Sequence, residues 1–220
     1  NFILFLVQAP VLAALLNIVF KNPGRYLPLS FYFCLTVSTI WIGGVSAVRA
    51  IAAEWSVLKR EYRAGLSINA YLLSKLIHIL FSSFLSGVLF FAVLVFLFHG
   101  YDLNRWLLLL ICSGTVSGAV LGLCISSFST HYGIAVSALP LVFIPQIFFS
   151  GILIPFDRMS QIGVFLSQLT VSRPLFAIYK QICILQTSLG TPGEWQTLFF
   201  LLTGLIILTR IAIYFHIVDR

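Results

Sequence analysis

The chain has 220 residues, of which 60% are hydrophobic and only 9% are charged, whereas a globular domain is typically about 45–50% apolar and about 25% charged. These proportions exclude a soluble enzyme and a disordered tail, and they are typical of a membrane protein. The formal net charge is +7, but the 13 Lys and Arg residues form no basic run interleaved with aromatic residues, so nucleic acid is not an expected partner.

Six apolar stretches predict an all-α, polytopic membrane protein with six transmembrane helices, because each is long enough to cross a bilayer at roughly 20 residues per helix. The predicted spans are 2–20, 26–48, 76–98, 106–128, 133–156 and 196–217. Polar residues around His131 predict a tight turn between the fourth and fifth spans. We interpret residues 1–220 as a single transmembrane domain and, because the chain begins at Asn1, as a piece of a longer polypeptide.

The connection after the second span carries the densest charge in the chain, with five basic and two acidic residues between 49 and 75. Trp55, Leu58 and Tyr62 recur at helical spacing, and Gly65 is a natural stop, which predicts an amphipathic helix over 52–65 at the membrane surface. Its basic face would bind anionic headgroups, and its carboxylates would bind a basic cytosolic partner. The alternative is a solvated interfacial helix without a partner.

The longest connection, 157–195, is only partly polar, and its apolar spacing predicts a short helix at the membrane surface. Loop charge does not decide the orientation of the chain. With a cytoplasmic N-terminus, seven Lys and Arg lie inside and six lie outside. The clustering of five of them in 49–75 favours placing that connection inside.

The charged connection also contains a spaced polar motif, with further matches downstream. The matching residues are Glu54, Arg60-Glu61-Tyr62, Gly65, Tyr71 and Ser74-Lys75, then Phe149-Ser150-Gly151 with Ile152-Leu153 and Pro155, and then Ser172-Arg173-Pro174. They resemble the permease domains of ATP-binding-cassette (ABC) transporters of the G (White/pleiotropic drug resistance) subfamily. The resemblance covers the chain in segment order, and the motif from Glu54 to Lys75 is its strongest part.

The resemblance implies a six-helix domain with a cytoplasmic N-terminus whose connecting helix faces a nucleotide-binding domain of the same polypeptide. Two such domains, identical or different, would pair around a central path. The sequence contains no G-x-x-x-x-G-K-[ST] loop, so we expect no cofactor in this segment, with ATP and Mg held by the partner domain. We assign no catalytic residue, and we expect a multi-pass protein of the plasma (cytoplasmic or inner) membrane.

Glu61 is the first candidate for coupling to the nucleotide-binding domain, followed by Glu54 and Arg60. By resemblance they occupy the family signature, and a carboxylate on a short, stiff helix can transmit the movement of a bound domain. The alternative for Glu61 is a surface carboxylate paired with an Arg three or four residues away, an interaction worth only tenths of a kcal/mol.

Two spans supply candidates for a substrate path. The resemblance places Thr39 and Ile42 on it, and the prolines of the fifth span favour a lining helix because freed backbone groups are tolerated only beside protein or a cavity. The candidates are Thr39, Ile42, Pro140, Phe143, Ile144 and Ile147 on the path, with Ile152 and Leu153 as an external plug. The alternative for both spans is ordinary helix packing.

Small residues in the fourth span point to packing rather than to chemistry. Gly114, Gly118 and Gly122 repeat every four residues, which is typical of a close contact between membrane helices. The four His and four Cys residues lack metal-ligand spacing, so we expect no metal site.

The resemblance, together with the apolar candidate path, implies the membrane domain of an ABC exporter that moves hydrophobic or amphipathic substrates (lipid, sterol or drug-like) outward by alternating access. Three alternatives remain: a permease that exports a polysaccharide or glycolipid, a structural membrane protein that transports nothing, and a membrane-embedded enzyme. A membrane-embedded enzyme would need a cluster of ionisable groups at one depth, and the spans show none.

Overall fold

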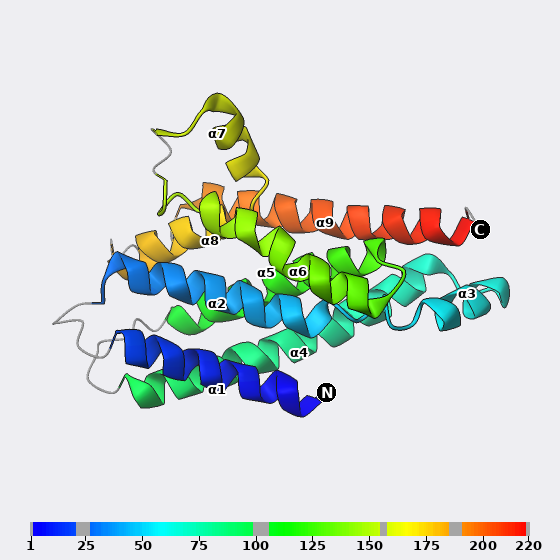
Figure 1. Ribbon diagram of the computed structural model, residues 1–220, viewed down its shortest axis with the longest axis horizontal. Coiled ribbons are helices and arrows are strands. Elements are labelled where there is room, and N and C mark those ends of the chain that lie inside the picture. The colour runs from blue at the N-terminus through cyan, green and yellow to red at the C-terminus, as the bar shows by residue number, and fades with distance from the viewer. Residues whose placement is uncertain (1, 21–26, 99–105, 155–157, 185–190, 219–220) are drawn as a thin grey trace.

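The computed structural model describes residues 2–20, 27–98, 106–154, 158–184 and 191–218, and within these ranges all regular structure is helical (Figure 1). In chain order the helices are α1 (Phe2–Val19), α2 (Leu29–Ala47), α3 (Trp55–Arg63), α4 (Ile68–Leu97), α5 (Leu107–Phe128), α6 (Tyr132–Phe148), α7 (Gln161–Gln168), α8 (Ser172–Tyr179) with the π-helical turn Lys180–Ile184, and α9 (Pro192–Val218). The predicted all-α class is confirmed.

The predicted number of six spans is not confirmed. Within the described ranges, four helices are long and apolar enough to cross a membrane, namely α2, α4, α5 and α9. The bent pair of α7 with Ser172–Cys183, which turns by 81°, adds a fifth candidate. The segments Val7–Val19 and Tyr132–Phe148 are apolar but shorter. By length and composition, the described part of the chain therefore holds four to five spanning helices, which makes it a multi-pass membrane protein.

Several predicted bounds need correction for local reasons. The fifth span was predicted to reach residue 156, but α6 ends at Phe148 and is followed by Gly151, whose φ of 85° lies in the left-handed region. α4 begins at Ile68, eight residues before the predicted span, because the Ser67 hydroxyl accepts a bond from the Ala70 N–H at 3.3 Å and caps the helix.

The helix predicted over 52–65 extends only over Trp55–Arg63, because the residues before Trp55 form turns. Its end is defined by Gly65, which adopts a φ of 103°. There the Leu66 N–H donates to the Glu61 carbonyl at 3.0 Å, and this bond closes the helix as in a Schellman motif.

The core is built around α5, which contacts α2, α4, α6, α8 and α9 and has 17 of its 22 residues buried. Its closest neighbour is α2. A Cβ atom at Gly118 would overlap the Ile40 carbonyl, and one at Gly122 would overlap the Gly44 carbonyl. Glycine at these positions lets the two backbones touch, which is how membrane helices associate in a solvent as apolar as their own side chains.

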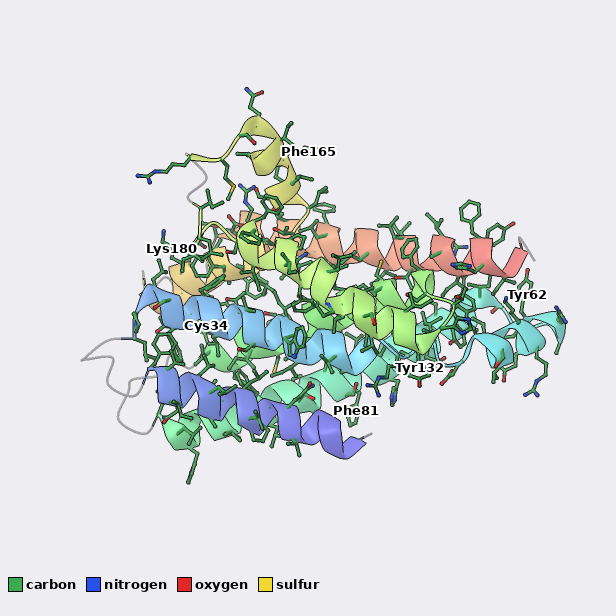
Figure 2. All side chains as sticks on the ribbon, in the orientation of Figure 1. Cys34, Tyr62, Phe81, Tyr132, Phe165 and Lys180 are labelled. Carbon is green, nitrogen blue, oxygen red and sulfur yellow. The ribbon has the colours of Figure 1, made fainter. Side chains whose placement is uncertain are left out.

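The two ends of the bundle differ (Figure 1). At one end lie α3, the beginning of α4 and the C-terminal end of α9. Toward the other end lie α8 and α7, and α7 stands off from the other helices; Figure 2 shows Phe165 on it. The apolar residues predicted for a surface helix are exposed on α7 or directly after it: Ile162, Phe165, Leu166 and Leu169.

Candidate functional site at the connecting helix

The turn that precedes α3 is bonded to the end of α5. The buried Ser126 hydroxyl accepts hydrogen bonds from the backbone N–H groups of Ile51 at 3.0 Å and Ala52 at 2.9 Å. The Trp55 indole N–H donates to the carbonyl of Ser129 at 2.6 Å. These bonds satisfy buried backbone groups across about 75 residues of sequence, so the position of α3 is tied to α5.

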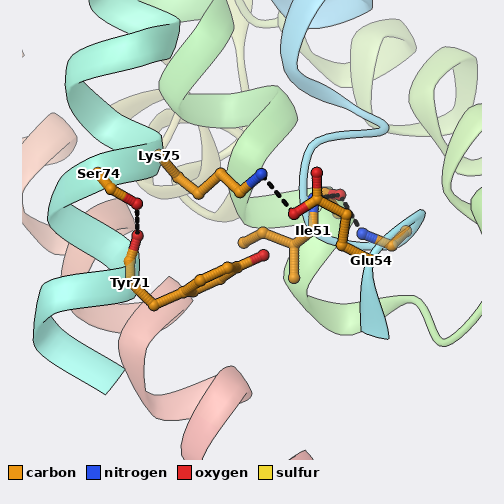
Figure 3. Close-up of polar contacts among 7 residues, drawn as sticks. Ile51, Glu54, Tyr71, Ser74 and Lys75 are labelled. Atoms are coloured by element: carbon orange, nitrogen blue, oxygen red, sulfur yellow. Dashed lines mark hydrogen bonds and ion pairs between the residues drawn. The ribbon is translucent and has the colours of Figure 1, made fainter. Parts of the chain in front are cut away.

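An ion pair ties the same turn to α4 (Figure 3). The Lys75 Nζ atom lies 2.6 Å from the Glu54 Oε2 atom, and it also lies 5.5 Å from the centre of the Tyr71 ring. The Lys75 side chain is 18% exposed and that of Glu54 is 47% exposed. At this exposure the pair is worth about 0–1 kcal/mol, so its main effect is to set the position of the turn rather than to stabilise the fold.

A third contact joins the start of α3 to α9. The ring of Trp55 meets that of His216 edge to face, with 5.3 Å between ring centres. The beginning of α3 therefore touches α4 through Glu54, α5 through Trp55 and the preceding turn, and α9 through Trp55 again.

The rest of α3 is divided between a buried and an exposed face. Leu58 is buried against the bundle, whereas Arg60, Glu61 and Arg63 are exposed. Within the described part of the chain, no Lys or Arg nitrogen lies within 4 Å of the Glu61 carboxylate, so the simple surface pair considered as an alternative is not formed there. The structure thus separates the predicted coupling residues: Glu54 pairs with Lys75 on α4, whereas Arg60 and Glu61 are exposed.

The contacts that hold α3 rest on residues not assigned to the site from the sequence, namely Trp55, Lys75, Ser126 and Ser129. Lys75 was part of the recognised motif but carried no role. The signal that could have found the two serines is their place at the polar break after the fourth span, which the predicted hairpin puts on the same side of the membrane as the charged connection.

The predicted path residues on α2 are buried inside the chain. Thr39 and Ile42 have no exposed surface. Thr39 packs against Gly114, where a Cβ atom would overlap its side chain. Neither side chain faces a surface in this conformation.

The predicted path residues on α6 lie on two faces. Phe143 is buried with its ring centre 5.1 Å from that of Trp41, and a Cβ at Gly44 would meet the Phe143 ring at 3.1 Å. Pro140 and Ile144 are exposed, and Ile147 is half-buried. After the helix, Ile152 is half-buried and Leu153 is exposed. Their roles on a path and in a plug stay predictions.

A buried amide on α6 was also missed. The Gln146 Oε1 atom accepts bonds from the N–H groups of Val171 at 2.9 Å and Ser172 at 3.1 Å, and the Ser172 hydroxyl donates to the Gln146 carbonyl. These bonds attach the start of α8 to α6. In the described residues, no three His, Cys, Asp or Glu side chains gather closely enough to hold a metal ion.

The amino-acid sequence was compared with known protein families. The family model described as ABC-2 type transporter matches residues 1–186, which is most of the chain. No curated protein shows significant similarity to it. The match extends from α1 through α8, so it includes α3 and its contacts with α4 and α5, whereas α9 lies beyond the matched residues. The chain belongs to the ABC-2 type transporter family, and it is a multi-pass membrane domain that serves as the permease component of an ABC transporter, the kind of domain that works with nucleotide-binding domains.

Proposed function

We propose that this domain belongs to an ATP-driven exporter of the G-subfamily type, which moves hydrophobic or amphipathic substrates (lipid, sterol or drug-like) outward by alternating access. A nucleotide-binding domain of the same polypeptide binds ATP and Mg at the cytosolic end, where α3 lies. A second permease domain, identical or different, completes the path across the plasma membrane.

The observation that carries this proposal is the arrangement of α3, whose start is held to the bundle and whose other face is exposed. Glu54, Trp55 and the turn before them hold its start to three long helices. Its exposed face presents Arg60 and Glu61 to a partner. Movement of a domain bound to this face would reach the bundle through contacts that are continuous from α3 to α4, α5 and α9.

The uncharged outer face of α6 supports an apolar substrate. Pro140, Leu141, Ile144 and Phe148 are exposed there, with Leu141 at 72% and Phe148 at 50%. A path between two paired domains would use this face first. Exposure of Thr39 and Ile42 to the same path requires α2 to change its packing during the cycle, which is a requirement of alternating access.

The external plug would follow directly from the end of α6. The turn at Gly151 redirects the chain, and the apolar side chains of Ile152 and Leu153 come immediately after it. In the proposed mechanism they close the path on the outside until substrate passes.

The test is vanadate-sensitive ATP hydrolysis by the full native product in lipid nanodiscs, comparing wild type, Glu61→Arg and the matched reversal Glu194→Arg at the start of α9. We expect lipids or apolar substrates to stimulate hydrolysis in the wild type and in Glu194→Arg, and the stimulation to be lost in Glu61→Arg.

Three outcomes contradict separate parts of the proposal. A Glu61→Arg protein that responds like wild type removes Glu61 from coupling. Stimulation by highly charged solutes alone overturns the apolar substrate class. A native product with no ATPase refutes the exporter and favours the structural role.

A further inference from the structure

A pocket of about 470 Å³ opens beside α3, at the end of the bundle that carries the candidate site. Its polar lining comes from three parts of the chain: α3, the α5–α6 connection with the first residue of α6, and the end of α9. We call it the α3–α9 pocket. Its polar lining residues are Ser56, Lys59, Thr130, His131, Tyr132 and His216. Figure 2 shows Tyr132 at this end of the molecule.

The polar lining of the pocket consists of hydrogen-bond donors and one fixed positive charge. Lys59 supplies an ammonium group, His131 and His216 supply imidazole N–H groups, and hydroxyls come from the remaining members. Among the residues that the structure describes, no carboxylate lines the pocket. Within the described residues no Asp or Glu oxygen lies within 4 Å of the Lys59 ammonium, because the only ion pair there joins Glu54 to Lys75.

The N-terminus of α6 adds to this positive potential. His131 is the residue before the helix, its side chain makes no capping bond, and both it and Tyr132 line the pocket. The first N–H groups of a helix lack partners within that helix, and its dipole favours negative charge at this end. An anion in the pocket would therefore meet a lysine, two imidazoles and a helix N-terminus together.

The surroundings of the pocket are those of a membrane interface. Trp55 and Tyr132, aromatic side chains with a polar end, border it, and such residues concentrate where the bilayer meets water. The helices that lead away from it carry exposed apolar side chains, Ile134 on α6 at 56% and Phe215 on α9 at 59%. A ligand with a charged head and apolar tails matches both environments.

We propose that the α3–α9 pocket binds the phosphate group of an anionic lipid, whose acyl chains lie along the exposed apolar surfaces of α6 and α9. Lys59 pairs with the phosphate, and the imidazoles, the hydroxyls and the α6 N-terminus donate hydrogen bonds to it. Such a lipid bridges α3 to α9 and to the α5–α6 connection. The site goes beyond the proposed transport cycle and requires no ATP.

The test measures binding of dioctanoyl phosphatidic acid to the full-length purified protein in neutral detergent by native mass spectrometry. Lys59→Gln removes the charge in the pocket, and Arg63→Gln removes an exposed charge from the same helix outside it. Loss of one charge-assisted contact at a half-exposed site predicts roughly fivefold weaker binding in Lys59→Gln. Arg63→Gln is expected to bind like wild type.

The comparison ligands separate a lipid from a free anion. Dioctanoyl phosphatidylcholine has the same tails without net charge, and inorganic phosphate has the charge without tails. We expect phosphatidic acid to bind several-fold more tightly than either. Equal binding of the two lipids overturns the phosphate site, equal binding of inorganic phosphate overturns the lipid assignment, and equal loss in the two variants overturns the location.

A second variant, His131→Ala, keeps the proposal open to refutation if Lys59→Gln does not fold. It removes an imidazole at the α6 N-terminus, and unchanged phosphatidic acid affinity in it contradicts the proposed site. Because binding is read without ATP hydrolysis, failure of this proposal leaves the exporter hypothesis untouched, and failure of the exporter hypothesis leaves the binding result intact.

Discussion

Lys75 on α4 forms an ion pair at 2.6 Å with Glu54, the residue that precedes α3 and lies 21 positions earlier in the chain. The pair closes a loop that contains the whole connecting helix. Both ends of that helix are thereby fixed relative to α4, one through Glu54 and the other through the short turn from Gly65 to Ser67.

Charge reversal in this pair is expected to affect the position of α3 more than the stability of the whole domain. Glu54→Lys and Lys75→Glu alone should each lower the unfolding free energy by less than about 1 kcal/mol, because Glu54 is half exposed. Each should also speed amide hydrogen exchange in α3. The double reversal restores the pair, so exchange should return toward wild type. Additive effects of the two single changes would show that the pair does not hold the helix.

Removal of the Ser126 hydroxyl is expected to lower the unfolding free energy more than either single charge reversal. Ser126→Ala leaves the N–H groups of Ile51 and Ala52 without their buried acceptor, at about 1–3 kcal/mol of stability. The matched change Ser113→Ala removes a hydroxyl that bonds only within α5, to Leu110. Thermal unfolding in detergent and hydrogen exchange at residues 51–52 measure the effect. Equal losses in the two variants would contradict the role of Ser126 in holding the turn.

Alanine at Gly118 is expected to disrupt the contact between α2 and α5. The new methyl group would overlap the Ile40 carbonyl, and backbone cannot move aside as a side chain can, so we expect a loss of about 1–3 kcal/mol. Gly204→Ala on α9 is the control, since no atom lies within 4 Å of a Cβ there. In a helix that change should be neutral or stabilising by roughly 0.5–1 kcal/mol. The thermal unfolding midpoints of the two variants measure the effect. A Gly118→Ala midpoint equal to that of wild type would refute the close contact.

Truncation of Gln146 is expected to release the start of α8. Gln146→Ala removes the acceptor for the N–H groups of Val171 and Ser172, which should cost about 1–3 kcal/mol and speed hydrogen exchange at those two residues. Gln168→Ala, an exposed amide on α7, should change neither. Unaltered exchange in the Gln146 variant would mean that other contacts hold α8 in place.

Apolar run length was sufficient to predict the long helices, because α2, α4, α5 and α9 are continuous runs with few charges. Local chemistry also predicted where α3 ends, since Gly65 can adopt the left-handed conformation that closes a helix. The predicted helix bounds were wrong where another local feature, a capping serine or a glycine turn, changed the start or end of a helix. Ser67 starts α4 before the apolar run begins, and Gly151 follows an early end of α6 within it.

Contacts between distant residues could not be predicted in the same way. That Glu54 meets Lys75 depends on the turns around α3, and that Ser126 accepts two N–H groups depends on where α5 ends. The resemblance placed Thr39 and Pro140 on one path, but residue spacing alone did not reveal that one is buried against α5 and the other is exposed.

The glycine contact between α2 and α5 constrains how the domain can change shape. The carbonyl groups of Ile40 and Gly44 on α2 lie against Gly118 and Gly122 of α5, so a sliding step of α2 along α5 would drive them into residues larger than glycine. Relative displacement then falls on α6, which meets α2 through the side chains of Trp41 and Phe143 and contains two prolines. In the proposed alternating cycle we therefore expect α6 to shift first, and we expect exposure of Thr39 to require α2 and α5 to separate rather than to slide.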